Sequence, residues 1–231
     1  MDKLKKITLE VIIKYIKILG GLKMKVMAFN GSPKANGNTY ASINAVAEEL
    51  KKEGIDVEII NVGNKNITGC KACGGCSKTG KCVINDGVNE MIEKMKDADG
   101  VILGSPVYYA GLNGTMKAFL DRAFMLVGAN GAFLRHKVGV SVAVARRAGT
   151  IQAVDEMNKF LSFYEMVIPT ANYWDVAFGG APGDALKDEE GMQIMRVLGK
   201  NMAWVLKLIE NGKATVKEPE REVKIKTNYI D

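Results

Sequence analysis

Four cysteines, Cys70, Cys73, Cys76 and Cys82, lie close together in the pattern C-x2-C-x2-C-x5-C, and the 231-residue chain contains no others. Thiolates at this spacing can converge on a compact metal centre, and a [4Fe–4S] cluster requires four of them. A zinc site with four thiolates more often pairs two C-x2-4-C knuckles across a longer stretch, so the regular spacing favours iron–sulfur. Zinc and redox-active C-x-x-C thiols remain open alternatives.

A second group of residues that could do chemistry lies in GSPKANGNT, residues 31–39. Ser32, Asn38, Thr39 and the amides of a following helix N-terminus supply neutral donors for an anion, and Lys34 adds a positive charge. The glycine spacing matches neither G-x-G-x-x-G nor a Walker A loop, which argues against dinucleotide binding or NTP hydrolysis. The segment indicates either a site for a terminal phosphate group or an ordinary N-capped turn.

The elements that must position these groups alternate between strand and helix from Met24 onward. Strands are predicted at 25–30, 57–62, 101–105, 138–145 and 166–171, and helices at 40–53, 88–97, 115–127, 151–164 and 188–211. This alternation predicts an α/β domain with a doubly wound, five-stranded parallel sheet and helices on both faces. The Gly- and aromatic-rich stretch 172–184 is predicted to be a loop.

The carboxyl ends of the strands are where ligands bind in such a sheet. The loops at these ends are 31–38, 63–87, 105–113 and 145–150. Both groups described above belong to them, so we expect the candidate site at this edge. The single histidine, His136, precedes the fourth strand at the opposite edge and is interpreted as structural.

The first loop, together with SPVYYAGLNGTMKAFLDR at 105–122, resembles the NADPH-dependent FMN reductase and flavodoxin-like family. The resemblance implies a flavodoxin-like fold in which the FMN phosphate is held by Ser32, Lys34, Asn38 and Thr39. It also implies that the flavin is flanked by Pro106, Val107, Tyr108 and Tyr109. A flat, amphipathic ring suits aromatic or apolar faces with a few donors at its edge.

Two arginines, Arg146 and Arg147, follow the fourth predicted strand in ARRAGT. They are candidates to approach the electron-rich edge of the flavin or to bind the carboxylates of a partner. The alternative is that both are solvated residues at a loop tip.

The cysteine motif narrows the resemblance to the iron–sulfur flavoproteins, a branch of the same family, over roughly residues 24–211. The resemblance implies an FMN-dependent oxidoreductase or electron-transfer protein in which the four cysteines bind a [4Fe–4S] cluster. It implies ferredoxin or NAD(P)H as the electron donor and a homo-oligomer, either a dimer or a tetramer. Two alternatives remain: an NAD(P)H-dependent FMN or quinone reductase without a cluster, and a zinc-stabilised FMN-binding module without turnover.

The net charge of the chain is +6, and its basic residues concentrate at the two ends. Residues 1–23 are predicted to be an amphipathic helical extension to the FMN-binding domain at 24–231, although Met24 could also be the physiological start. This extension is too short and too charged to span a bilayer, so a membrane location is not expected. Without a recognisable cleavable signal peptide or a basic stripe interleaved with aromatics, we expect a cytoplasmic protein that binds no nucleic acid.

Overall fold

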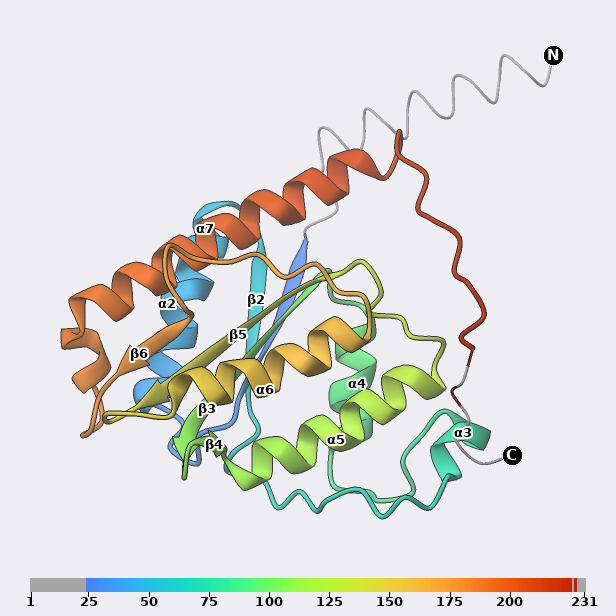
Figure 1. Cartoon of the computed structure of the whole chain (residues 1–231), viewed down its shortest axis with the longest axis horizontal. Coiled ribbons are helices and arrows are strands. Elements are labelled where there is room, and N and C mark those ends of the chain that lie inside the picture. The colour runs from blue at the N-terminus through green and yellow to red at the C-terminus, as the bar shows by residue number, and fades with distance from the viewer. Residues whose placement is uncertain (1–23, 226, 228–231) are drawn as a thin grey trace.

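A parallel β-sheet forms the centre of the computed structural model, which describes residues 24–225 and 227 (Figure 1). Its strands are β1 (Lys25–Asn30), β2 (Asp56–Asn61), β3 (Gly100–Tyr108), β5 (Val138–Ala145) and β6 (Val176–Phe178). They are ordered β2-β1-β3-β5-β6 and pair in parallel throughout. A short strand, β4 (Gly111–Leu112), pairs antiparallel with the end of β3. The five-stranded, doubly wound parallel sheet predicted from the sequence is confirmed.

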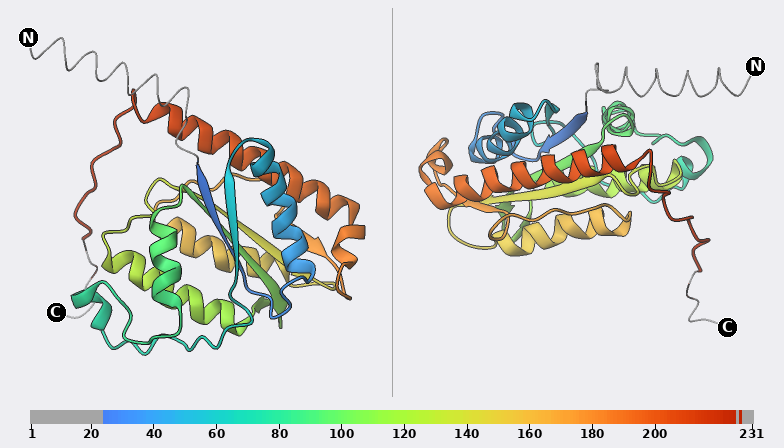
Figure 2. Two further views of the ribbon diagram at one scale, coloured as in Figure 1. Left: turned by 180° about the vertical axis from the view of Figure 1, so that it is seen from behind. Right: turned by 90° about the horizontal axis from the view of Figure 1, so that it is seen from above.

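Helices cover both faces of this sheet, as the two views in Figure 2 show. One face carries α2 (Asn38–Lys52) and α7 (Glu189–Gly212), and the other carries α4 (Val88–Lys96), α5 (Gly114–Ala129) and α6 (Thr150–Phe163). Two smaller elements are α3 (Gly75–Thr79), within the cysteine loop, and the 3-10 helix η1 (Asp184–Lys187).

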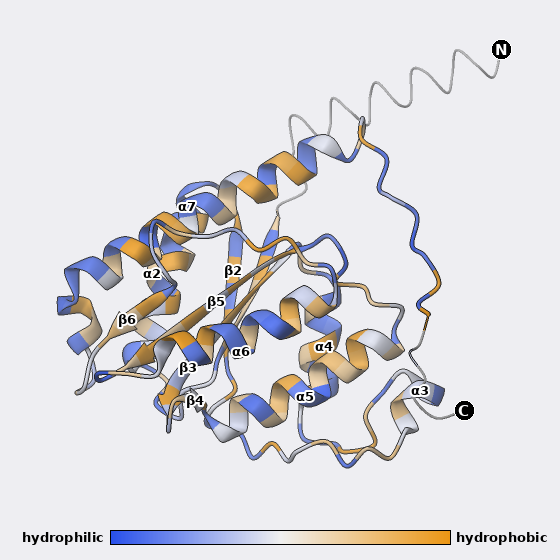
Figure 3. Ribbon diagram, viewed as in Figure 1, coloured by the Kyte–Doolittle hydropathy of each residue, from blue (hydrophilic) through white to orange (hydrophobic). Residues whose placement is uncertain are grey.

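Both faces of the central strands are buried, because each packs against a layer of helices. Along β1, Met27 and Phe29 join the core beneath α4 and α5, whereas Val26 and Ala28 join the core beneath α2 and α7. The strands therefore read as continuous apolar runs, as expected for a parallel sheet covered on both sides. Figure 3 shows this apolar colouring along the strands and mixed colouring on the helices.

The edge strand is the one element that the sequence analysis misplaced. Residues 166–171 are not a strand: Val167 forms a single isolated bridge with Val138, and the chain then leaves the sheet. Pro169 has no backbone N–H to continue the ladder. The fifth parallel strand is instead β6, inside the stretch 172–184 that was predicted to be a loop.

The other predicted elements are confirmed with small shifts at their ends. The largest shift is at β3, which continues to Tyr108 because β4 folds back and pairs with Val107 and Tyr108. His136 lies before β5, at the edge opposite the predicted site, and its backbone N–H donates to Glu165 O at 3.0 Å.

The predicted division of the chain at residue 23 stays a prediction, because the proposed helical extension 1–23 lies outside the described residues. Among the residues that are described, no helix is long and apolar enough to cross a membrane.

Candidate functional site

A cavity of about 210 Å³ opens at the carboxyl edge of the sheet, where β1, β3, β5 and β6 end. Eight of the ten residues proposed to hold the flavin line it: Ser32, Lys34, Asn38, Thr39, Pro106, Val107, Tyr108 and Arg146. Tyr109 and Arg147 are not among the lining residues and are exposed to solvent. The folded chain thus brings three predicted loops and the segment after β6 together around one hollow.

The loop after β1 is held in shape by its own side chains. Asn30 Oδ1 accepts a hydrogen bond from the Ser32 amide at 3.0 Å, and Ser32 Oγ accepts one from the Lys34 amide at 3.1 Å. Helix α2 then begins with no side-chain cap and no acidic residue in its first turn. Its free amides and its dipole therefore suit an anionic group, which fits the phosphate of FMN.

The chain after β2 presses against this same loop. Asn61 Nδ2 donates to Ser32 O at 3.1 Å. A Cβ atom at Gly63 would overlap the carbonyl oxygen of Gly31, so only glycine allows this approach. Two neighbouring strand ends thereby fix the position of Ser32.

Asn38 has a structural task that its sequence position did not reveal. Its Nδ2 donates to Ala181 O at 2.8 Å, and its Oδ1 accepts from the Ala185 amide at 3.2 Å. A Cβ atom at Gly179 would lie 2.8 Å from the same Nδ2. The Asn38 amide group thus ties the segment after β6 to the start of α2, and in doing so builds one wall of the cavity.

The turn between β3 and β4 supplies the opposite wall. Tyr109 and Ala110 adopt left-handed backbone conformations, with φ of 49° and 61°, and the turn directs the Tyr109 side chain fully into solvent. Asn113 then caps α5 by accepting from the amides of Thr115 and Met116. Pro106 and Val107 are left as apolar surface beside the hollow, which suits a flavin ring.

A second, smaller cavity of about 160 Å³ is lined by all four cysteines. Its other walls are largely apolar and include Val83, Ile84, Met125 and Leu126. The loop wraps around it through α3, which is flanked by left-handed glycines at Gly74 and Gly80. Among the described residues, no three Cys, His, Asp or Glu side chains are grouped as a site for a metal ion. The cysteines instead share the lining of one hollow.

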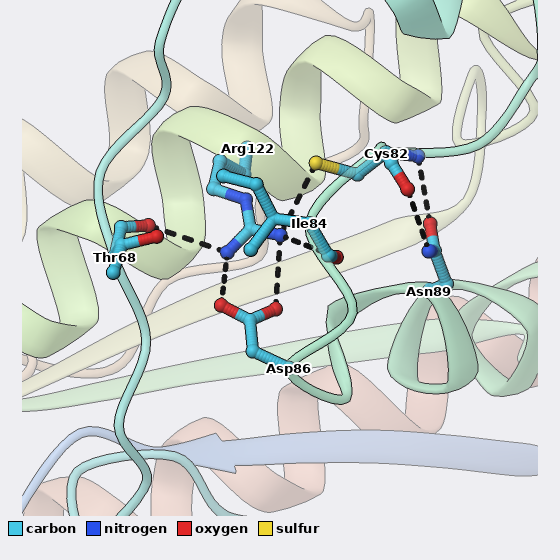
Figure 4. Close-up of polar contacts among 6 residues, drawn as sticks. All are labelled: Thr68, Cys82, Ile84, Asp86, Asn89 and Arg122. Carbon is cyan, nitrogen blue, oxygen red and sulfur yellow. Dashed lines mark hydrogen bonds and ion pairs between the residues drawn. The ribbon is translucent and has the colours of Figure 1, made fainter.

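The side chain of Arg122, on α5, organises this cysteine loop (Figure 4). Its Nη2 donates to Cys82 Sγ at 3.1 Å and to Ile84 O at 3.2 Å, and its Nη1 donates to Thr68 O at 3.3 Å. Both Nη atoms also pair with the carboxylate of Asp86. A buried cation with a partly buried counterion therefore joins the two ends of the loop.

The ion pair shifts the pKa of both partners. Burial raises the pKa of Asp86, but the hydrogen bond and charge of Arg122 outweigh it, so the net pKa is lowered. Burial lowers the pKa of Arg122, but Asp86 and Cys82 outweigh it, and the net pKa is raised. Both groups are therefore held in their charged forms.

Two asparagines hold the main chain of the same loop. Asn89 Oδ1 accepts from the Cys82 amide at 2.8 Å, and its Nδ2 donates back to Cys82 O at 3.0 Å. Asn130 Nδ2 donates to Gly80 O at 2.8 Å. These residues, with Arg122 and Asp86, were not singled out from the sequence. The available signal was an arginine among the apolar residues of FLDRAFML.

The strand order, the cavity at the carboxyl edge and the uncapped start of α2 define a flavodoxin-like flavin protein. The sequence profile of the NADPH-dependent FMN reductase family matches residues 24–181. An iron–sulfur flavoprotein of Methanocaldococcus jannaschii is 39% identical over 194 residues, covering 81% of this chain and 100% of that protein. An iron–sulfur flavoprotein of Methanosarcina thermophila is 32% identical over 193 residues, covering 82% and 99%.

Solved structures agree on the fold. The crystal structure of RosB matches with a TM-score of 0.64 at 14% identity, covering 89% of this chain and 92% of that one. A flavodoxin from the domain Archaea matches with a TM-score of 0.54 at 17% identity, covering 80% and 99%. The chain belongs to the NADPH-dependent FMN reductase family and, within it, to the iron–sulfur flavoproteins. It is a flavin-dependent oxidoreductase with FMN as its cofactor.

Proposed function

We propose that the protein transfers electrons between a [4Fe–4S] cluster bound by Cys70, Cys73, Cys76 and Cys82 and FMN bound at the carboxyl edge of the sheet. The observation that carries this proposal is the single apolar cavity lined by all four cysteines. The relatives from Methanocaldococcus jannaschii and Methanosarcina thermophila are both called iron–sulfur flavoproteins. When bound, the cluster supplies single electrons, and FMN accepts or releases one or two.

In this proposal, separate sets of residues bind the cluster and FMN. The four cysteines supply thiolates: Cys76 and Cys82 are partly buried beside the apolar side chains of the cavity, whereas Cys70 and Cys73 are exposed. At the other cavity, Ser32, Thr39, Lys34 and the first amides of α2 hold phosphate. Pro106, Val107 and Tyr108 cover the ring, and Arg146 brings positive charge to it.

The connection between the two sites is short. Gly63 lies against the loop after β1, and Cys70 follows seven residues later, a stretch that spans at most about 25 Å. This length sets an upper limit on the distance from Gly63 to Cys70, and the proposal includes transfer either within a subunit or across an interface.

The electron donor in this proposal is either ferredoxin or NAD(P)H, and the protein acts as a cytoplasmic homo-oligomer of two or four chains. The family name supports a nicotinamide donor. A relative from Bacillus subtilis, 24% identical over 73% of this chain and 93% of its own length, is named a putative NAD(P)H-dependent FMN-containing oxidoreductase. That relative supports the second candidate function, an NAD(P)H-dependent FMN or quinone reductase without a cluster.

The decisive experiment is an absorption spectrum with iron, sulfide and zinc analysis on protein purified without oxygen. The proposal expects flavin bands, broad iron–sulfur absorption and about four iron atoms per chain. Flavin without iron would favour the plain reductase, and one zinc per chain without iron would favour a zinc-stabilised FMN-binding module. Absence of flavin would contradict the assignment of the phosphate loop.

Variants in the cysteine loop test whether the two sites are separate. Cys73→Ala is expected to lose iron and keep FMN, because the candidate FMN contacts lie in other loops. Ser77→Ala, an exposed change in the same loop, is the matched control and is expected to keep both. Loss of FMN together with iron in Cys73→Ala would contradict the two-site arrangement.

The donor is identified by mixing the oxidised protein with NADPH, NADH or reduced ferredoxin and following the flavin absorption. Rapid bleaching by NADPH alone would favour the reductase. Bleaching that requires ferredoxin would favour the electron carrier.

A further inference from the structure

Arg122 is the one fully buried arginine side chain among the described residues, with 2% of its surface exposed. Arginine is rarely this buried unless its charge is paired, because removing a guanidinium from water is costly. Asp86 supplies the counter-charge, with Nη2 of Arg122 donating to Asp86 Oδ1 at 2.9 Å. The pair lies beside the cysteines, because Arg122 lines their cavity and contacts Cys82 Sγ.

The hydrogen bonds of Arg122 go to both ends of the cysteine loop. Thr68 O lies before the first cysteine, whereas Ile84 O and the Asp86 carboxylate lie after the last one. One rigid guanidinium thus sets the separation of the two ends and the width of the loop between them. The loop itself contributes only the five-residue helix α3.

The contact with Cys82 also places a positive charge beside a ligand sulfur. Arg122 Nη2 lies 3.1 Å from Cys82 Sγ and carries a positive charge. Arg122 also lines the cysteine cavity, and its buried Nε has no hydrogen-bond acceptor among the described residues. A sulfur-rich anionic group in this cavity would have a cationic donor already fixed beside it.

We propose that Arg122 is a positioning residue for the cluster: it holds the ends of the cysteine loop together and, by donating to Cys82 Sγ, raises the reduction potential of the cluster. This inference rests on the proposed function. Hydrogen bonds and positive charge near ligand sulfurs stabilise the reduced, more negative state of a cluster. Asp86 opposes the effect, because its carboxylate offsets part of the charge on Arg122.

The test is a spectroscopic redox titration of the cluster in the holoprotein, with iron and FMN content measured for each variant. Arg122→Gln is expected to lower the potential. Arg122→Lys is expected to lower it less, because lysine keeps the positive charge but lacks the paired Nη donors of the guanidinium. A tenfold fall in the ratio of reduced to oxidised cluster at a fixed applied potential corresponds to about 59 mV. We expect a change of this order for Arg122→Gln.

Of two further variants, one is expected to shift the reduction potential in the opposite direction and the other is a control. Asp86→Asn is expected to raise the potential, because Arg122 keeps its contact with Cys82 and loses its counter-charge. Lys207→Gln removes one positive charge from α7, on the other face of the sheet, where Lys207 pairs with Glu53, and is expected to change nothing. If Arg122→Gln does not fold, the double variant Arg122→Gln with Asp86→Asn leaves no unpaired buried charge and is compared with Asp86→Asn alone.

A second measurement tests, without using the redox signal, whether Arg122 holds the two ends of the cysteine loop together. Trypsin cleavage after Lys71, Lys78 and Lys81, which are exposed in the cysteine loop, is expected to become several-fold faster in Arg122→Lys and unchanged in Lys207→Gln. Wild-type potential in all Arg122 variants with full iron content would overturn the inference and leave the proposed function intact. So would unchanged cleavage. Wild-type protein without iron would overturn the proposed function and this inference together.

Discussion

Asp175 offers a direct test of how this fold tolerates a buried acid. Its side chain precedes β6 with 6% of its surface exposed, and Oδ1 is buried without a hydrogen-bond partner among the described residues. Burial raises the pKa of Asp175 from 3.8 to about 7, against the smaller opposing effect of a hydrogen bond from the Ala171 backbone. The folded state therefore prefers the neutral acid.

The sign of the pH dependence follows from this shift. An acid whose pKa is raised on folding costs nothing well below its unfolded pKa, and its penalty grows as the pH rises toward the folded pKa. At about 1.4 kcal/mol per pKa unit, a rise from 3.8 to about 7 costs roughly 4 kcal/mol at pH 8 and roughly 2 kcal/mol at pH 5. Stability is expected to fall across this window.

The perturbation is Asp175→Asn, which keeps the shape and removes the ionisation. Its amide places a new unpaired donor in the core at a cost of about 1–3 kcal/mol. This cost is the same at both pH values, so it cancels in the difference. The variant is expected to gain about 2 kcal/mol relative to wild type between pH 5 and pH 8.

The assay is urea unfolding of wild type and variant at the two pH values, with linear extrapolation to water. Asp155→Asn, which removes an exposed carboxylate, controls for the loss of one negative charge. A relative gain below about 0.5 kcal/mol, or a loss, would refute the reasoning that burial raises the pKa of Asp175 in the folded protein.

Three further changes test the flavin cavity. Gly63→Ala is expected to lower the unfolding free energy by about 1–3 kcal/mol and to weaken FMN retention, because the new methyl group overlaps Gly31 O; urea unfolding and flavin release on dilution measure both. Thr39→Val is expected to weaken FMN binding about tenfold, equivalent to the loss of one hydrogen bond of about 1.4 kcal/mol, with iron content unchanged; fluorescence titration of the apoprotein checks it, and wild-type affinity would contradict a phosphate contact. Asn38→Ala is expected to weaken FMN binding and to speed proteolysis after Lys187, because the segment after β6 loses both of its hydrogen bonds to α2.

The buried strands could be predicted from the sequence because their signal is local. KVMAFN and VGVSVAVA are mostly apolar, and both form strands over the predicted residues. The edge strand could not be found in the same way. MVIPTA has the stronger apolar pattern, but pairing at the edge depends on which segment reaches β5 in register, and VAF reaches it after a long excursion.

The candidate site shows the same division between local and distant information. The phosphate loop and the cysteine motif are contiguous, so their residue types and spacing indicate their chemistry. Arg122 meets Asp86 and Thr68 only because α5 packs beside the chain after β2, and the acidic partner of an isolated arginine cannot be read from spacing. The exposure of Tyr109 likewise depends on the left-handed backbone of Tyr109 and Ala110. Neither residue is a glycine, so the sequence does not indicate this conformation.

The chain between Thr68 and Asp86 enters and leaves the domain at a single point, since both of its ends meet one arginine side chain. A segment anchored in this way can change in length or content at little cost to the sheet, because loop-closure entropy rises only slowly with the number of residues. The flavin cavity, built from other loops, would keep its shape. Lineages of this fold could therefore gain or lose a cysteine insert as a unit, converting a single-cofactor enzyme into a two-cofactor one without redesigning the core.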